Sequence, residues 1–107
     1  MESNANLVNA KNKDGDTALQ WASMYGQTNV VKLLLSKGAN VDAFNAEGLN
    51  AFLLAALNGK KDVVELFIKH GVDVNSRMKK YGAATALMIA AREGYKDIVE
   101  LLIENGA

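Results

Sequence analysis

The sequence contains no cysteine, and histidine occurs once. Without cysteine the chain forms no disulfide and offers no thiolate to a metal, which is typical of proteins in a reducing compartment. Catalysis by a nucleophile needs a base that is itself held in place, and His70 is the one imidazole available for that role. These shortages argue against thiol chemistry and against a serine–histidine hydrolase.

An excess of charge of one sign is also missing, because 12 Lys and Arg residues balance 12 Asp and Glu residues. The chain therefore has no overall positive field that would attract nucleic acid or an anionic membrane. No window approaches the roughly 20 consecutive apolar residues that a membrane-spanning helix needs, and the N-terminus has no basic segment followed by an apolar run. We expect a soluble, intracellular and cytoplasmic protein with neither nucleic acid nor membrane as a partner.

What the sequence does contain is a repeat. Glycines recur at a spacing of 33 residues and then of 35, at Gly15, Gly26 and Gly38, at Gly48, Gly59 and Gly71, and at Gly94 and Gly106. A period of this size predicts units that bury their apolar faces only by stacking on one another. We expect one domain over residues 1–107, made of the tail of a preceding repeat (1–13), repeat one (14–45), repeat two (46–77) and repeat three (78–107).

Each repeat is expected to form two short helices. In repeat one the first helix runs from Thr17 to about Tyr25 and the second from about Asn29 to Lys37, which carries a broad apolar stripe. Gly26 and Gly38 follow these helices, where glycine favours the left-handed conformation that ends a helix. Between repeats, alternating valines precede a polar turn with glycine, and this pattern predicts a β-hairpin.

The stretches "TALQWAS", "NAFLLAA" and "TALMIAA" resemble the Thr-Pro-Leu-His-x-Ala signature of ankyrin repeats. The segments "GQTNVVKLLLSKGANVDA", "GKKDVVELFIKHGVDVNS" and "GYKDIVELLIENGA" are similar to the rest of the family pattern, so the resemblance covers essentially the whole chain. It implies an all-α repeat fold, a solenoid of stacked helix-turn-helix units joined by β-hairpin loops. Alanine replaces the signature proline in each repeat, at Ala18, Ala51 and Ala86. The signature histidine is replaced by Gln20, Leu53 and Met88, so its usual hydrogen bonds are absent or replaced.

No motif in the sequence supports an enzyme, a cofactor site or a metal site. His70 falls at the exposed end of a second helix, where a solvated imidazole is the simpler interpretation. Asp14 and Asp16 share one short turn with no third ligand at a recognisable spacing, and we interpret them as turn formers. The stretch "NGKKD" lacks the glycine and lysine spacing of a phosphate-binding loop.

The ankyrin resemblance implies that a partner binds the hairpin tips and the exposed ends of the first helices, which together form a concave strip. This strip is unusually apolar for a solvated surface, and such a patch often marks an interaction site. Trp21 shares its repeat position with Leu54 and Ile89 and is therefore expected in the core. The predicted partner-binding residues are Lys13, Asp14, Asp16, Met24, Tyr25, Phe44, Glu47, Leu49, Leu57, Asn58, Arg77, Lys79, Lys80, Tyr81, Arg92 and Glu93.

The two extra residues of the third repeat lie between Asn75 and Thr85, in a loop rather than in a helix. The insertion lengthens a finger at the partner-facing edge, and its "RMKKYG" joins three cations to an aromatic ring. We hypothesise that Arg77, Lys79, Lys80 and Tyr81 form a partner-specific finger for an acidic protein or peptide. The alternative is that loops accept insertions at little cost and that charged tips aid solubility.

The leading interpretation is a non-enzymatic protein–protein interaction module. The alternative is a structural spacer or a self-associating segment of a longer ankyrin-repeat protein. "MESNA" is too short for a helix pair, and the final helix has no polar cap, although repeat arrays generally need caps. We expect either that the chain belongs to a longer protein or that its ends pair. The apolar residues expected on the uncapped final helix are Ile98, Val99, Leu101, Leu102 and Ile103.

Overall fold

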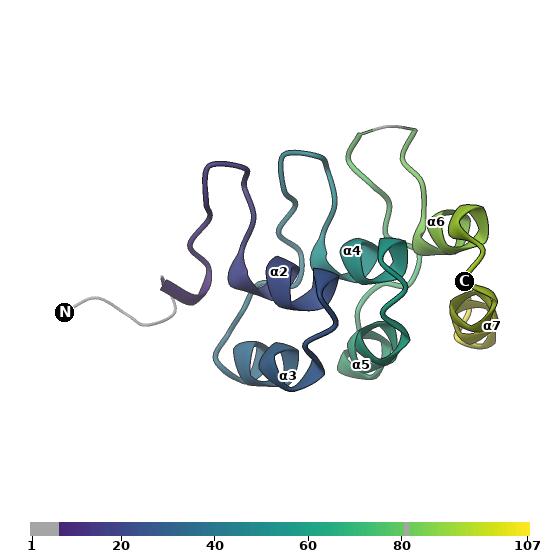
Figure 1. Ribbon diagram of the computed structural model, residues 1–107, viewed down its shortest axis with the longest axis horizontal. Helices are drawn as coiled ribbons and strands as arrows, with labels where there is room; N and C mark the ends of the chain where they lie inside the picture. Colours follow the sequence, from purple (N-terminus) through teal and green to yellow (C-terminus); the bar gives the residue numbers. More distant parts are fainter. Residues whose placement is uncertain (1–6, 81) are drawn as a thin grey trace.

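The computed structural model describes residues 7–80 and 82–107. Six helices lie within these residues: α2 (Ala18–Met24), α3 (Thr28–Ser36), α4 (Ala51–Leu57), α5 (Lys61–His70), α6 (Ala86–Glu93) and α7 (Lys96–Glu104). Figure 1 shows α2, α4 and α6 in one row, α3, α5 and α7 in a second row, and three long loops that rise from the first row. The molecule is elongated, with extents of 46 × 27 × 20 Å. The predicted all-α repeat fold is confirmed.

The first helix of each repeat begins at a side chain that caps it. Thr17, Asn50 and Thr85 have extended backbones, and each side-chain oxygen accepts a hydrogen bond from the backbone N–H three residues on, at 2.9–3.3 Å. These bonds satisfy amides that have no partner within the helix. Only a polar residue with a short side chain performs this role, so the repeated Thr or Asn determines where each first helix starts.

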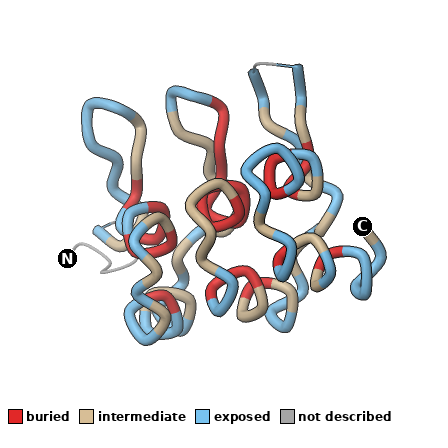
Figure 2. Tube along the Cα trace, turned by 45° about the vertical axis from the view of Figure 1, so that its right-hand side comes forward, coloured by how far each residue is buried: buried red, intermediate tan, exposed pale blue. Residues whose placement is uncertain are grey.

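Buried residues gather along the first helices and where the two rows meet (Figure 2). Small residues, Ala22, Ala55 and Ala90, occupy the same position in each first helix and are buried, which permits close packing of successive repeats. Within repeat two, the rings of Phe52 and Phe67 pack edge to face with their centroids 6.4 Å apart. The core is therefore continuous from repeat to repeat.

Two expectations about the core are wrong. Trp21 is 50% exposed, because the side of α2 that carries it faces away from repeat two. Ile98 and Leu102 are fully buried, so the final helix does not expose the whole apolar set expected of it. Ile103 does lie exposed on that helix.

The three long loops are called fingers one, two and three here, and they comprise residues 9–16, 42–49 and 75–84. In the described residues their β-pairing is limited to one isolated antiparallel bridge, between Arg77 and Thr85. In each finger one backbone hydrogen bond of 2.9–3.0 Å joins the two arms, and the donor and acceptor residues are Asn12 and Asp16, Asn45 and Leu49, and Met78 and Ala84. A second bond of 3.0–3.4 Å closes the turn, from Gly15 to Asn12, from Gly48 to Asn45 and from Ala83 to Lys80. The fingers are therefore turns held by side chains more than strand ladders.

Candidate protein-binding site

Asparagine side chains shape the tips of fingers one and two. Asn12 Oδ1 accepts hydrogen bonds from the backbone N–H groups of Asp14 and Asp16, at 2.9 and 3.0 Å. Asn45 Oδ1 repeats this arrangement one repeat later, accepting from Glu47 and Leu49 at 3.0 Å each. An asparagine that bonds the backbone two and four residues on replaces the regular ladder of a hairpin.

The carboxylate of Asp16 holds two elements together. Its Oδ2 accepts from Trp21 Nε1 at 3.3 Å, and its Oδ1 accepts from Asn45 Nδ2 at 3.1 Å. These contacts tie finger one to α2 and to finger two. Across residues 7–80 and 82–107, no three potential metal-ligating side chains come together.

The fingers are joined to one another by backbone hydrogen bonds. The amide of Ala46 donates to the carbonyl of Asp14 at 3.1 Å, and the amide of Lys79 donates to the carbonyl of Gly48 at 2.9 Å. A Cβ on Gly48 would lie 2.8 Å from the amide nitrogen of Lys80, so only glycine permits this approach. The fingers consequently form one wall along the edge of the solenoid.

Finger three is braced by two of the cations that the sequence suggested for partner binding. Arg77 Nη1 donates to the carbonyl of Ala83 at 3.1 Å, across the base of the finger. Lys79 Nζ lies 4.9 Å from the centroid of the Phe44 ring on finger two, in cation–π geometry. Lys80 is exposed. Tyr81 lies outside the described residues.

A hollow of about 350 Å³ lies where fingers two and three meet α4 and α6. Its lining is mostly apolar, with the carboxylate side chain of Glu47 and the guanidinium side chain of Arg92 as its charged members. We call it the finger hollow, and its lining residues are Glu47, Leu49, Leu57, Met78, Ala84, Met88, Ile89 and Arg92.

The structure brings four of the predicted residues together in the finger hollow. Glu47 and Arg92 are exposed, Leu57 is half-buried, and Leu49 is only 4% exposed. The expectation that Leu49 lies on the exposed strip is therefore wrong, because its side chain packs into the core. The assignment of these residues to partner binding stays a prediction.

Two methionines in the finger hollow were missed by sequence reasoning. Met78 alternates with the exposed Arg77 and Lys79, and this alternation alone could have indicated that it points inward. Met88 is 53% exposed and occupies the repeat position where the ankyrin signature has histidine. Methionine is flexible and polarisable, and it suits a surface that adapts to a bound side chain.

The other predicted residues are dispersed or already engaged. Asn58 Nδ2 donates to the carbonyl of Leu54 at 2.8 Å and so ends α4. Glu93 forms an exposed ion pair of 3.1 Å with Arg92 of the finger hollow. The remaining members lie on fingers one and two and on α2: Lys13, Asp14 and Tyr25 are exposed, whereas Met24 and Phe44 are half-buried.

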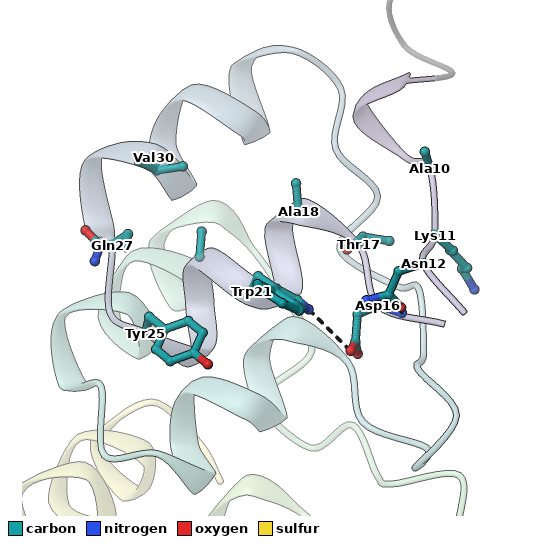
Figure 3. A pocket seen from close by; sticks show the side chains of 11 residues that line it. Ala10, Lys11, Asn12, Asp16, Thr17, Ala18, Trp21, Tyr25, Gln27 and Val30 are labelled. Carbon is teal, nitrogen blue, oxygen red and sulfur yellow. Dashed lines mark hydrogen bonds between the residues drawn. The ribbon is translucent and has the colours of Figure 1, made fainter. Parts of the chain in front are cut away.

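A larger hollow, of about 660 Å³, lies on the far side of repeat one. Figure 3 shows Trp21 of α2, Tyr25 directly after α2, Val30 of α3 and Ala10 around it, with the indole held by its hydrogen bond to Asp16. The two rings make an edge contact, with centroids 6.2 Å apart. We call this surface the repeat-one face.

Stacked helix pairs with fingers along one edge define a helical repeat solenoid. The family model described as ankyrin repeats (3 copies) matches residues 42–107, and the model described as ankyrin repeat matches residues 14–46. The chain belongs to the ankyrin repeat family. A comparison with curated proteins gives no match.

Members of this family generally act as protein–protein interaction modules, and they are typically not enzymes. None of the helices that the structure describes is long and apolar enough to cross a membrane. Fold and family together therefore direct attention to the exposed surfaces of the array.

Proposed function

We propose that this chain is a non-enzymatic interaction module that binds an extended peptide segment of a partner protein along the fingers and first helices. The observation that carries the proposal is the finger hollow, a mostly apolar depression whose lining includes one acidic and one basic side chain. It lies at the junction of two repeats, on the surface where the family resemblance expects a partner.

The finger hollow is suited to one apolar anchor side chain. Its volume of about 350 Å³ lies at the small end of the range for binding pockets in proteins. Leu57, Met78 and Met88 supply an apolar lining, and full burial of a leucine, methionine or phenylalanine side chain contributes about 1.5–3 kcal/mol. A few such anchors dominate the affinity of most protein interfaces.

The charges around the finger hollow favour an acidic residue near the anchor. The exposed Lys79 and Lys80 lie on the adjoining finger three, and Arg92, which is paired with Glu93, lines the finger hollow itself. Glu47, which also lines the finger hollow, favours a cation at another point of the bound peptide. Rim charges of this kind mainly raise the association rate and make it sensitive to salt.

Peptides selected from a random display library on the immobilised chain provide the test. The proposal predicts an apolar residue with an acidic neighbour in the selected sequences, and loss of their binding to the variant Met88→Asp. Ile103→Asp is the matched control, because Ile103 is 57% exposed on α7, outside the finger hollow, and Met88 is 53% exposed. Equal binding by both variants would rule out the finger hollow as the site.

A further inference from the structure

Comparing the same position in three repeats shows which side chains a neighbouring repeat covers. Trp21 and Val30 are 50% and 46% exposed, and Ala18 is exposed as well. Their counterparts one and two repeats later are all buried: Ala51, Leu54 and Val63, then Ala86, Ile89 and Ile98. The preceding repeat covers these positions in repeats two and three, whereas in repeat one they are exposed in the part of the chain that the structure describes and form the repeat-one face.

Repeat three has the complementary open side, on α6 and α7. Met88, Ala91 and Ile103 are exposed there. On the first helices of repeats one and two, their counterparts are buried: Gln20, Ser23, Leu53 and Ala56. On the second helices the counterparts are half-buried: Leu35 and Ile68. We call this surface the repeat-three face. It carries the positions that, in the other two repeats, the following repeat covers.

Glycines after the first helices mark the register in which one repeat stacks on the next. A Cβ added to Gly26 would lie 2.9 Å from a side-chain atom of Lys60, in the next repeat. A Cβ added to Gly59 would lie 2.9 Å from a side-chain atom of Tyr95, again in the next repeat. Gly94, at the same position in repeat three, has nothing within 4 Å of that point. The residue that corresponds to Lys60 and Tyr95 in repeat one is Gln27, which lines the repeat-one face. In the same register, Gln27 of another copy would cover Gly94.

The charges of the outer helices complement each other in that register. Lys32 of α3 lines a surface hollow together with Asp62 and Glu65 of α5. Glu100 holds the position of Lys32 and Glu65 on α7, so stacking α7 on α3 of another copy places Glu100 beside Lys32. This reverses the order of charges at the first junction, where Lys32 and Glu65 line one hollow. By contrast, the α5 and α7 junction brings the like charges Glu65 and Glu100 to one hollow, with Lys61 also in its lining.

We infer that the repeat-one face binds the repeat-three face of a second copy, head to tail, so that both helix rows continue across the junction. This association does not depend on the proposed peptide site, although the repeat-three face shares Met88 with the finger hollow. Because the two contacting faces differ, each dimer retains one free face of each kind, and the contact does not close by itself. Chains longer than two copies therefore form at high concentration.

Sedimentation equilibrium over a wide range of concentration tests the association. The full chain is expected to show a weight-average mass that rises with concentration beyond that of a dimer. The variants Val30→Glu and Ile103→Lys each block one face and are expected to remain monomers alone. Mixed in equal amounts, they are expected to form a species of two chains and nothing larger, since each supplies the face that the other lacks.

Other results of this experiment would overturn the inference. A monomer at every concentration would mean that a second copy does not cover the repeat-one face. Self-association of Ile103→Lys alone would indicate that two repeat-one faces pair with each other. Unchanged association of both variants would place the contact elsewhere. Circular dichroism and urea unfolding establish that each variant is folded before the masses are compared.

A charge exchange tests the register independently. Lys32→Glu and Glu100→Lys are each expected to weaken the association about two- to fivefold, as for an exposed ion pair. The double variant restores the opposite charges across the junction and is expected to recover the affinity of the parent chain. Failure of the double variant to recover would overturn the register.

Discussion

Finger three contains a backbone conformation that glycine adopts in fingers one and two. Ala83 has φ = 55°, and it is the one residue other than glycine with positive φ in the described parts of the chain. Its counterparts are Gly15 and Gly48, with φ of 77° and 79°. The left-handed region costs a residue with a Cβ about 1–2 kcal/mol. We predict that Ala83→Gly stabilises the protein.

The magnitude follows from two opposing terms. The substitution removes the left-handed penalty, but it increases the conformational entropy of the unfolded chain, at a cost of about 0.4–1 kcal/mol. Both hydrogen bonds at this residue, from Arg77 Nη1 to its carbonyl and from its amide to the carbonyl of Lys80, involve backbone atoms and are retained. The net stabilisation is therefore about 0.5–1 kcal/mol. For a chain of this size it raises Tm by roughly 2–8 °C.

Thermal unfolding followed by circular dichroism measures the effect, and Ala46→Gly provides the matched control. Ala46 lies near the tip of finger two and is not among the residues with positive φ, so glycine there adds only the entropy of the unfolded chain. We expect Ala46→Gly to lower the free energy of unfolding by about 0.4–1 kcal/mol. If Ala83→Gly lowered Tm as much as Ala46→Gly does, the reasoning would be refuted.

Three further predictions, with four substitutions, test the fingers and their attachment. Gly48→Ala and Gly38→Ala both place a side chain at positive φ, but only the first also crowds finger three, so it is expected to lower Tm more; equal losses would contradict the close approach. Gln20→Leu removes two hydrogen bonds, one from Gln20 Nε2 to the carbonyl of Ala43 at 2.8 Å and one from the Thr17 amide to Gln20 Oε1 at 2.9 Å. It is expected to lower the free energy of unfolding, measured in urea, by about 1–3 kcal/mol. Among the described residues Ser76 Oγ is buried without a hydrogen-bond partner, so Ser76→Ala, which reproduces the Ala43 of the preceding repeat, is expected to raise the free energy of unfolding by up to about 1 kcal/mol; a loss would contradict this.

The period of the sequence predicted the helix pairs and their stacking because each feature depends on local chemistry that recurs. A polar cap such as Thr17 begins a first helix, and a glycine follows its end. The sequence also predicted that the hydrogen bonds of the signature histidine are absent or replaced, and in repeat one they are replaced. There Gln20 replaces the histidine. Its side chain accepts a hydrogen bond from the Thr17 amide and donates one to the carbonyl of Ala43.

The exposure of Trp21 could not be predicted in the same way. Its counterparts Leu54 and Ile89 correctly indicated the direction in which the side chain points, which is toward a preceding repeat. Burial depends in addition on what occupies that space, and a repeat position carries no information about this.

The error on Leu49 has a different cause. Its counterparts Asp16 and Ala84 have different chemistry, so comparison between repeats could not show which way this side chain packs.

Met88 connects the two proposed surfaces and makes them compete. It lines the finger hollow, yet its counterparts Gln20 and Leu53 are buried by the following repeat. A second copy stacked on the repeat-three face therefore covers part of the surface that a peptide anchor would contact. Linkage requires the reverse effect to be equal, so a peptide bound in the finger hollow weakens head-to-tail association by the same factor. The chain then presents its peptide site most fully as a monomer or at the repeat-three end of a stack.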